Sequence, residues 1–176
     1  MNETFVITLS DLRTGVYTAR WNVSTEFFEE FENQQVRSAE LEVQVTARKT
    51  GASVDVDLDI RGTLTVPCDR CLEDVSMPVD SSPRLKVRFG QQPAGDAEEE
   101  DGRELVWIPE GESQVDLAQT IYDYSCLSLP IQCCHREGEC NPEALKHLNP
   151  SEEASRDSQQ PEDSPFSALK GLFDNK

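Results

Sequence analysis

The sequence turns back on itself at residues 67–74, which read Pro67-Cys68-Asp69-Arg70-Cys71-Leu72-Glu73-Asp74. On both sides of this stretch, apolar and polar residues alternate, which is the pattern of a half-buried β-strand. Pro67 ends the first alternating run because proline has no backbone N–H to donate to a strand ladder. The stretch is therefore expected to form a hairpin end that carries a Cys-x-x-Cys pair.

The alternation continues through most of residues 39–89. In four segments the apolar residues occupy every second position, so they share one face of a strand: 39–47, 54–66, 75–79 and 85–89. Gly62 interrupts the second segment, and a glycine inside a strand indicates a bulge or a close approach of another backbone. We predict that these segments form an antiparallel meander with one solvated face.

Shorter elements are expected on both sides of the meander. Strand patterns occur at 5–9, 16–23 and 105–108, and helix patterns occur at 25–34, over about ten residues after Asp116, and from Pro142 to Leu148. The first helix would place Phe27, Phe28 and Phe31 on one face. Residues 90–104 lack apolar periodicity, so we expect a mobile loop there. The predicted fold class is α+β, an antiparallel meander with a few short helices.

The chain is expected to comprise a single domain over residues 1–148 and an acidic flexible tail over 149–176. Residues 149–163 contain too few apolar side chains to bury the surface that an ordered segment requires. The tail then ends in a predicted short helix with an apolar stripe made of Phe166, Leu169, Leu172 and Phe173. Such a helix either docks back on the domain or binds a partner.

The net charge of −18 argues against a broad nucleic-acid-binding face, because phosphate contacts require Lys and Arg. The charge is unevenly distributed. Residues 61–90 carry five basic and four acidic side chains, whereas residues 91–116 carry nine acids and one Arg. The Cys-x-x-Cys region is therefore the least acidic long part of the chain, and the acidic run is either solvated surface or an attractor for a basic partner.

The six cysteines indicate a metal site or redox groups if the chain resides in a reducing compartment. The first residues carry an acid and no apolar run long enough for a signal peptide, and no stretch is apolar enough to span a bilayer. We therefore expect a cytoplasmic protein that is not membrane-bound.

A second cysteine-rich stretch, Cys133-Cys134-His135-Arg136-Glu137-Gly138-Glu139-Cys140, supplies the partner for the hairpin cysteines. Two cysteines from each side, or three cysteines and one histidine, complete the tetrahedral shell of a structural zinc ion. The predicted zinc ligands are Cys68, Cys71, His135 and Cys140. Cys133 or Cys134 could replace His135, so the residue pattern leaves the fourth ligand open, and metal-free reduced thiols are the alternative to bound zinc.

Other chemistry fits the sequence less well. A thioredoxin-type Cys-x-x-Cys opens a helix whose dipole lowers the thiol pKa. Here a strand pattern follows, and the nearby acids Asp69, Glu73 and Asp74 disfavour a thiolate. Beyond His135 the chain has one further histidine, His147, and neither a nucleophile elbow nor a phosphate-binding glycine loop is present. We therefore expect a protein that is not an enzyme.

Several motifs resemble those of the YceD family, the large ribosomal RNA subunit accumulation proteins. The stretch 67–73 is similar to that family's Cys-x-Arg-Cys signature, and the segment from Asp116 to Pro130 resembles its helix leading into a Leu-Pro. His135 and Cys140 follow the proline at the matching spacings, and residues 165–170 resemble its closing element. The resemblance covers about residues 60–176. It implies a cytoplasmic factor for the accumulation or processing of 23S ribosomal RNA and for large-subunit assembly.

Two kinds of partner are compatible with this expectation. A local basic patch could contact ribosomal RNA, and its candidate residues are Arg61, Arg70, Arg84, Lys86, Arg88 and Arg136. Alternatively, a basic ribosomal protein or pre-ribosomal large-subunit particle could be attracted by the acidic run 91–116 and by the tail. We favour the protein partner because it makes use of the negative charge. A zinc-stapled interaction module with a non-ribosomal partner is the alternative function.

Overall fold

The computed structural model describes residues 5–9, 12, 15–91 and 99–148. The predicted tail 149–176, with its apolar helix, lies outside the described residues, and so do residues 92–98 of the predicted loop. The strands are β1 (Val6–Thr8), β2 (Val16–Ser24), β3 (Ser38–Thr50), β4 (Ser53–Pro67), β5 (Asp74–Ser81), β6 (Arg84–Phe89), β7 (Glu99–Glu100), β8 (Arg103–Ile108) and β9 (Gln114–Asp116). The helices are α1 (Thr25–Glu30), α2 (Ala118–Leu127) and α3 (Pro142–Leu148).

The predicted antiparallel meander is confirmed. Strand β2 pairs with β3, β3 pairs with β4, and β4 pairs with both β5 and β6, all antiparallel. Strands β5 and β6 lie end to end along the same edge of β4 in one continuous register. The backbone N–H of Leu58 donates to the carbonyl of Pro83 at 3.0 Å and bridges the junction between them. The β4–β5 hairpin ends at Pro67 and Asp74, which places the Cys-x-x-Cys pair at its tip.

The sheet continues beyond the meander in a way that the residue pattern did not predict. Strand β8 pairs with β6 in parallel, and β7 pairs antiparallel with β8. The expectation of a loop throughout residues 90–104 is therefore wrong at 99–100 and 103–104, which are strands. These four residues are all charged, so a search for alternating apolar residues does not detect the strands. Strands β1 and β9 form a separate two-stranded sheet.

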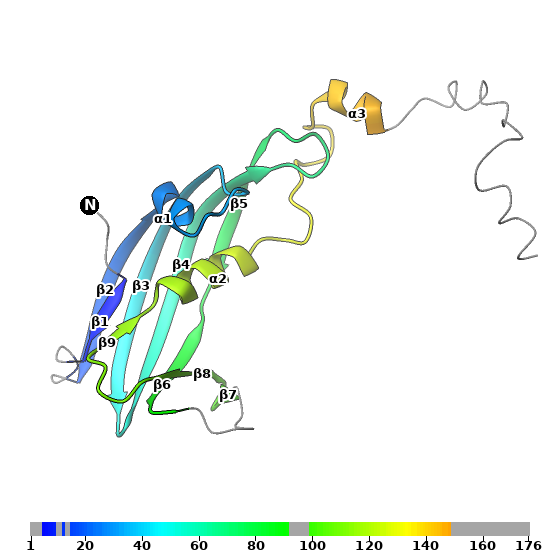
Figure 1. The fold of residues 1–176 in the computed structure, drawn as a ribbon. Coiled ribbons are helices and arrows are strands. Elements are labelled where there is room, and N and C mark those ends of the chain that lie inside the picture. Colours follow the sequence, from blue (N-terminus) through cyan, green and yellow to red (C-terminus); the bar gives the residue numbers. More distant parts are fainter. Residues whose placement is uncertain (1–4, 10–11, 13–14, 92–98, 149–176) are drawn as a thin grey trace, which may run out of the picture.

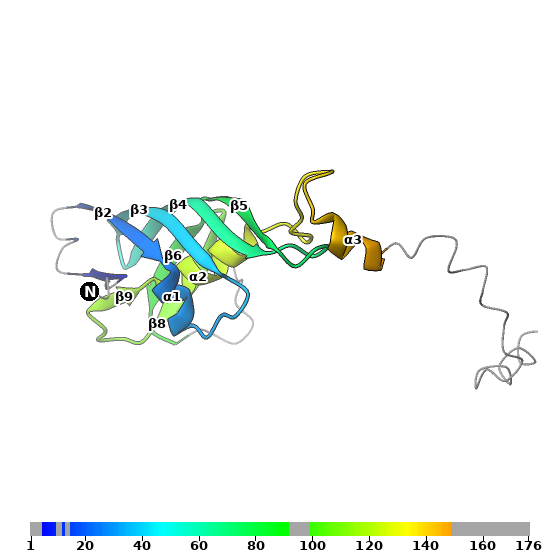
Figure 2. The same cartoon turned by 90° about the horizontal axis from the view of Figure 1, so that it is seen from above.

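The alternating apolar side chains of the meander strands form the core, and all of those in β3 and β4 are buried. Helices α1 and α2 and the β1–β9 pair cover this face of the long sheet, as Figures 1 and 2 show. Phe31, directly after α1, stacks on Tyr122 of α2, and their ring centroids are 4.3 Å apart. Gly62 lies against the neighbouring strand so closely that a Cβ would come within 2.0 Å of the Glu40 carbonyl oxygen. The predicted close backbone approach is thus present.

Helix α1 is shorter than the predicted 25–34. Glu32 adopts a φ of 55°, outside the helical range, and the chain turns there. The Asn33 side-chain oxygen then accepts from the N–H groups of Gln35 (2.8 Å) and Val36 (3.1 Å), which stabilises the turn. None of the helices in the described part of the chain has the length and apolar character that a membrane span requires.

Candidate metal centre

The hairpin tip presents its two cysteines from a tight knuckle. The N–H of Cys68 donates to the Glu73 carbonyl at 2.8 Å, and the N–H of Leu72 donates to the Cys68 carbonyl at 2.9 Å. Leu72 has a φ of 63°, a left-handed conformation that turns the chain directly after Cys71. Both cysteines are thereby directed inward, and both are buried.

The second pair of side chains comes from the loop between α2 and α3. A turn in this loop is closed by the N–H of Glu139, which donates to the Arg136 carbonyl at 3.1 Å. Gly138 supplies the positive φ of 87° that the turn needs. The turn brings His135 and Cys140 onto one side of the loop, facing the tip of the hairpin.

Hydrogen bonds fasten this loop to the hairpin tip. Asp69 donates its backbone N–H to the Cys133 carbonyl at 2.8 Å, and its carboxylate accepts from the Cys133 N–H at 2.7 Å. One residue beyond Cys140, the amide of Asn141 donates to the Glu73 carboxylate at 2.7 Å. These contacts bracket the four candidate ligands, so the two loops are held in register on either side of them. In Figure 1 the tip and the loop that leads to α3 lie together at one end of the sheet.

The four side chains form a compact donor cluster. The ligating atoms of Cys68, Cys71, His135 and Cys140 all lie within 4.8 Å of one another. The Sγ atoms of Cys68 and Cys140 are 3.9 Å apart, and His135 Nδ1 lies 3.4 Å from the Cys71 Sγ and 3.9 Å from the Cys140 Sγ. A tetrahedral zinc ion with ordinary bond lengths would separate its ligand atoms by about 3.8 Å for two sulfurs and about 3.6 Å for sulfur and nitrogen. The cluster could therefore hold a metal ion with little rearrangement.

A hydrogen bond at Nε2 of the imidazole favours His135 over Cys133 and Cys134 as the fourth ligand. Its Nε2 lies 3.1 Å from the Asp74 carbonyl oxygen, which can only accept. The proton therefore belongs on Nε2, and the lone pair of Nδ1 points into the cluster, as is usual for metal-binding histidines. The thiol of Cys133 instead lies 3.6 Å from the Pro130 carbonyl, and Cys134 is outside the cluster.

Burial and mutual contacts shift the pKa values of three side chains in the cluster. Burial by itself would raise the pKa of Cys68, but N–H groups of Cys71, His135 and Arg70, with the His135 ring, lower it to about 5. Burial, and then hydrogen bonding to the neighbouring thiols, raises the pKa of Cys140 to about 11. The hydrogen bond to Cys68 raises the pKa of His135. The site thus favours one thiolate beside a positive charge, and a metal ion could take the place of the protons.

Half of the six candidate residues of the basic patch form ion pairs within the chain. Lys86 is only 9% exposed and its ammonium contacts Glu100 (3.1 Å) and Asp101 (2.8 Å), while Arg88 also pairs with Glu100. Lys86 and Arg88, two of the three patch candidates on β6, are therefore paired with acids of the same chain. Of the three, Arg84 is exposed. The acids that pair with Lys86 and Arg88 belong to the β7–β8 turn, which the sequence pattern did not reveal as structured.

The other candidate basic residues divide into two groups. Arg61, on the solvated face of the sheet, lies 3.9 Å from Asp59 and 3.6 Å from Asp80. Arg70 and Arg136 are exposed on the two loops of the metal centre, and neither makes an ion pair with another described residue. The two loops of the metal centre therefore each carry one exposed arginine.

Comparison with known proteins adds one finding. The family model for the large ribosomal RNA subunit accumulation protein YceD matches residues 56–173, a span that includes both halves of the cysteine and histidine cluster. No curated protein and no solved structure matches the chain. Because the match covers well over half of its residues, the chain belongs to the YceD family, the large ribosomal RNA subunit accumulation proteins.

Proposed function

We propose that the chain is a non-enzymatic, cytoplasmic factor for 23S ribosomal RNA accumulation and large-subunit assembly, and that a zinc ion staples its hairpin tip to the loop before α3. The observation that carries this proposal is the family match over residues 56–173, which spans all four members of the donor cluster. Membership of the family supplies the link to ribosomal RNA, and the cluster supplies a physical role for the cysteines.

Zinc is the metal that best suits the donor set. Thiolates and imidazole are borderline-soft ligands that favour zinc, whereas calcium and magnesium prefer oxygen. We expect about one zinc per chain when the protein is purified without chelator. Metal analysis should show loss of zinc from Cys68→Ser and Cys140→Ser and its retention in Cys134→Ser, the matched control from the same loop. Equal zinc content in all four proteins would remove the site.

A structural role for the ion follows from its surroundings. The three ligand cysteines are buried, with exposures of 0% for Cys68, 6% for Cys71 and 6% for Cys140. Four protein ligands leave no open coordination position for a substrate, and a catalytic zinc ion needs one. The ion would instead join two segments that are 64 or more residues apart along the chain.

A basic ribosomal protein within the pre-ribosomal particle is the proposed direct partner. The chain carries 34 acids against 16 basic residues, and two of the three basic residues of β6, Lys86 and Arg88, are paired with acids of the same chain. A broad phosphate-binding face is therefore difficult to assemble, whereas attraction of a basic protein uses the charge that the chain has.

Depletion of the protein in its own host tests the function as a whole. We expect a smaller large-subunit peak in sedimentation profiles and less 23S ribosomal RNA relative to 16S. Restoration by the natural chain, but not by Cys68→Ser, would connect the metal centre to this function. A normal large-subunit peak after depletion would instead favour an interaction module with a non-ribosomal partner.

A further inference from the structure

A hollow lies at the end of the sheet opposite the metal centre. It has a volume of about 720 Å³ and is lined by Gly90, Gln91, Trp107, Pro109 and Glu110. Gly90 and Gln91 follow β6, Trp107 lies in β8, and Pro109 and Glu110 follow β8. The N–H of Gly90 donates to the Ile108 carbonyl at 2.9 Å. Ser53 of β4 is level with Trp107, and the 14 residues from there to Pro67 at the hairpin tip span about 46 Å at the usual rise per residue. The hollow is therefore independent of the cysteine cluster.

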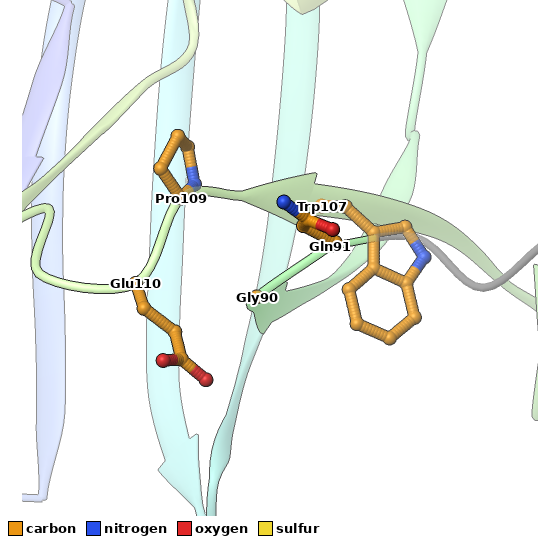
Figure 3. A pocket seen from close by; sticks show the side chains of 5 residues that line it. All are labelled: Gly90, Gln91, Trp107, Pro109 and Glu110. Carbon is orange, nitrogen blue, oxygen red and sulfur yellow. The ribbon is translucent and has the colours of Figure 1, made fainter.

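The lining combines an aromatic ring, a carboxylate and an amide. Figure 3 shows Gly90 between the Glu110 carboxylate and the Trp107 ring in this view. A Cβ at Gly90 would come within 3.6 Å of a Glu110 carboxylate oxygen, so the glycine keeps this part of the hollow free of a side chain. Its φ of 124° is also one that other residues rarely adopt.

Trp107 already accommodates a cation. The guanidinium of Arg88, its register neighbour on β6, lies 5.8 Å from the ring centroid. Arg88 is itself paired with Glu100, so its charge is compensated within the chain. An indole ring attracts cations through its negative face, and tryptophan does so more strongly than the other aromatic residues.

Three acids near the hollow have partners within the chain, but Glu110, which lines the hollow, does not. Glu100 and Asp101 pair with Lys86, and Glu104 accepts from the Tyr124 hydroxyl. By contrast, Glu110 and its neighbour Glu112 are exposed and make no ion pair or side-chain hydrogen bond with another described residue. Among the acids of residues 100–112, the unpaired negative charge is therefore that of Glu110 and Glu112, beside the hollow, and not that of residues 100–101.

We propose that this hollow binds a Lys or Arg side chain from an extended basic segment of the protein partner. The cation would lie between the Glu110 carboxylate and the Trp107 ring, and the Gln91 amide would offer hydrogen bonds to the backbone of the segment. Charge complementarity selects this occupant, because the phosphates of an RNA strand would meet the unpaired Glu110 and Glu112 carboxylates. This inference rests on the proposed function, and it specifies which surface meets the basic partner.

The test uses the full chain and a fluorescein-labelled dodecapeptide of alternating Lys and Gly, with binding followed by anisotropy at low salt. An alternating Ser and Gly peptide and a single-stranded oligouridine are the comparison probes. Glu110→Gln and Trp107→Leu should each weaken binding of the Lys peptide about three- to fivefold, as expected for one exposed ion pair or one cation–π contact. Glu29→Gln, which removes the same charge from the exposed side of α1, should leave affinity within about 1.5-fold.

A second readout keeps the inference testable if a variant is unstable. Trp21 and Trp107 are the two tryptophans of the chain, so Trp21→Phe leaves Trp107 as the reporter. The Lys peptide should change the Trp107 emission and the Ser peptide should not. Equal weakening by Glu29→Gln, or an emission change with oligouridine in place of the Lys peptide, would overturn the inference.

This outcome is separable from that of the proposed function. If Glu110→Gln and Trp107→Leu associate with pre-ribosomal particles as the natural chain does, the hollow is not the contact, although the assembly role stands. If the natural chain fails to associate with these particles while the peptide results hold, the assembly role is wrong and the basic-segment site remains.

Discussion

Replacing Cys140 with serine is expected to release residues 131–148 from the hairpin tip while the sheet stays folded. In the absence of a metal ion, and apart from the weaker sulfur contacts within the cluster, four hydrogen bonds hold this segment to the tip: the Asp69–Cys133 pair, His135 to the Asp74 carbonyl, and Asn141 to Glu73. Helix α3 has 7 residues, which is too short to persist in water by itself.

If the cluster holds zinc as proposed, the energies indicate that the ion decides whether the segment stays ordered. Ordering about 18 residues costs about 18 kcal/mol of backbone conformational entropy at about 1 kcal/mol each. The four hydrogen bonds return about 4 kcal/mol at about 1 kcal/mol each. Structural zinc binding contributes about 10–16 kcal/mol at neutral pH, which brings the two sides to within a few kcal/mol. Loss of one ligand should therefore free the segment.

Hydrogen exchange measured by mass spectrometry checks this expectation. In Cys140→Ser, and in the natural chain treated with a strong zinc chelator, peptides from 131–148 should exchange rapidly, whereas peptides from the centres of β3 and β4 should keep their protection. Cys134→Ser is the matched control and should behave as the natural chain does. Persistent protection of 131–148 in Cys140→Ser would refute the reasoning, because packing and hydrogen bonds would then suffice without metal.

Two further predictions concern the sheet. Gly62→Ala should destabilise the protein by at least about 2 kcal/mol in urea unfolding, because its Cβ would overlap the Glu40 carbonyl; an unchanged midpoint would show that β3 can move away. The hydrogen bond to Lys86 lowers the pKa of Glu100 and of Asp101, and the bond to Asp101 raises that of Lys86. Depressed carboxyl pKa values mean that this pairing stabilises the fold at neutral pH. Its contribution should be lost as the pH falls below about 4, and, through Lys86, as it rises above about 10.5. NMR titration of both carboxyls should therefore show midpoints below their usual values, and Lys86→Met should abolish the shift.

Local periodicity was sufficient to predict the central meander and its hairpin tip. A strand's side chains alternate every second residue, so the apolar parity of residues 39–66 identifies the buried face without knowledge of the partner strands. The Cys-x-x-Cys pair follows directly, because it lies where one alternating run ends and the next begins. The second half of the donor cluster was predicted from residue type, since cysteine and histidine are metal ligands wherever the chain folds.

Only the tertiary structure showed the features that depend on contacts between residues far apart in the sequence: strand pairing, the burial of Lys86 and the orientation of His135. The parallel pairing of β6 with β8 leaves no local signature, and neither does the antiparallel pairing of β1 with β9 across more than 100 residues. Hydrogen-bond partners are chosen by which strand edges remain unpaired nearby. Lys86 has the polar parity of a solvated residue, yet the β7–β8 turn buries it beneath two carboxylates. The choice of His135 over its neighbouring cysteines likewise depends on the Asp74 carbonyl, 61 residues away in the chain, which orients the imidazole toward the cluster.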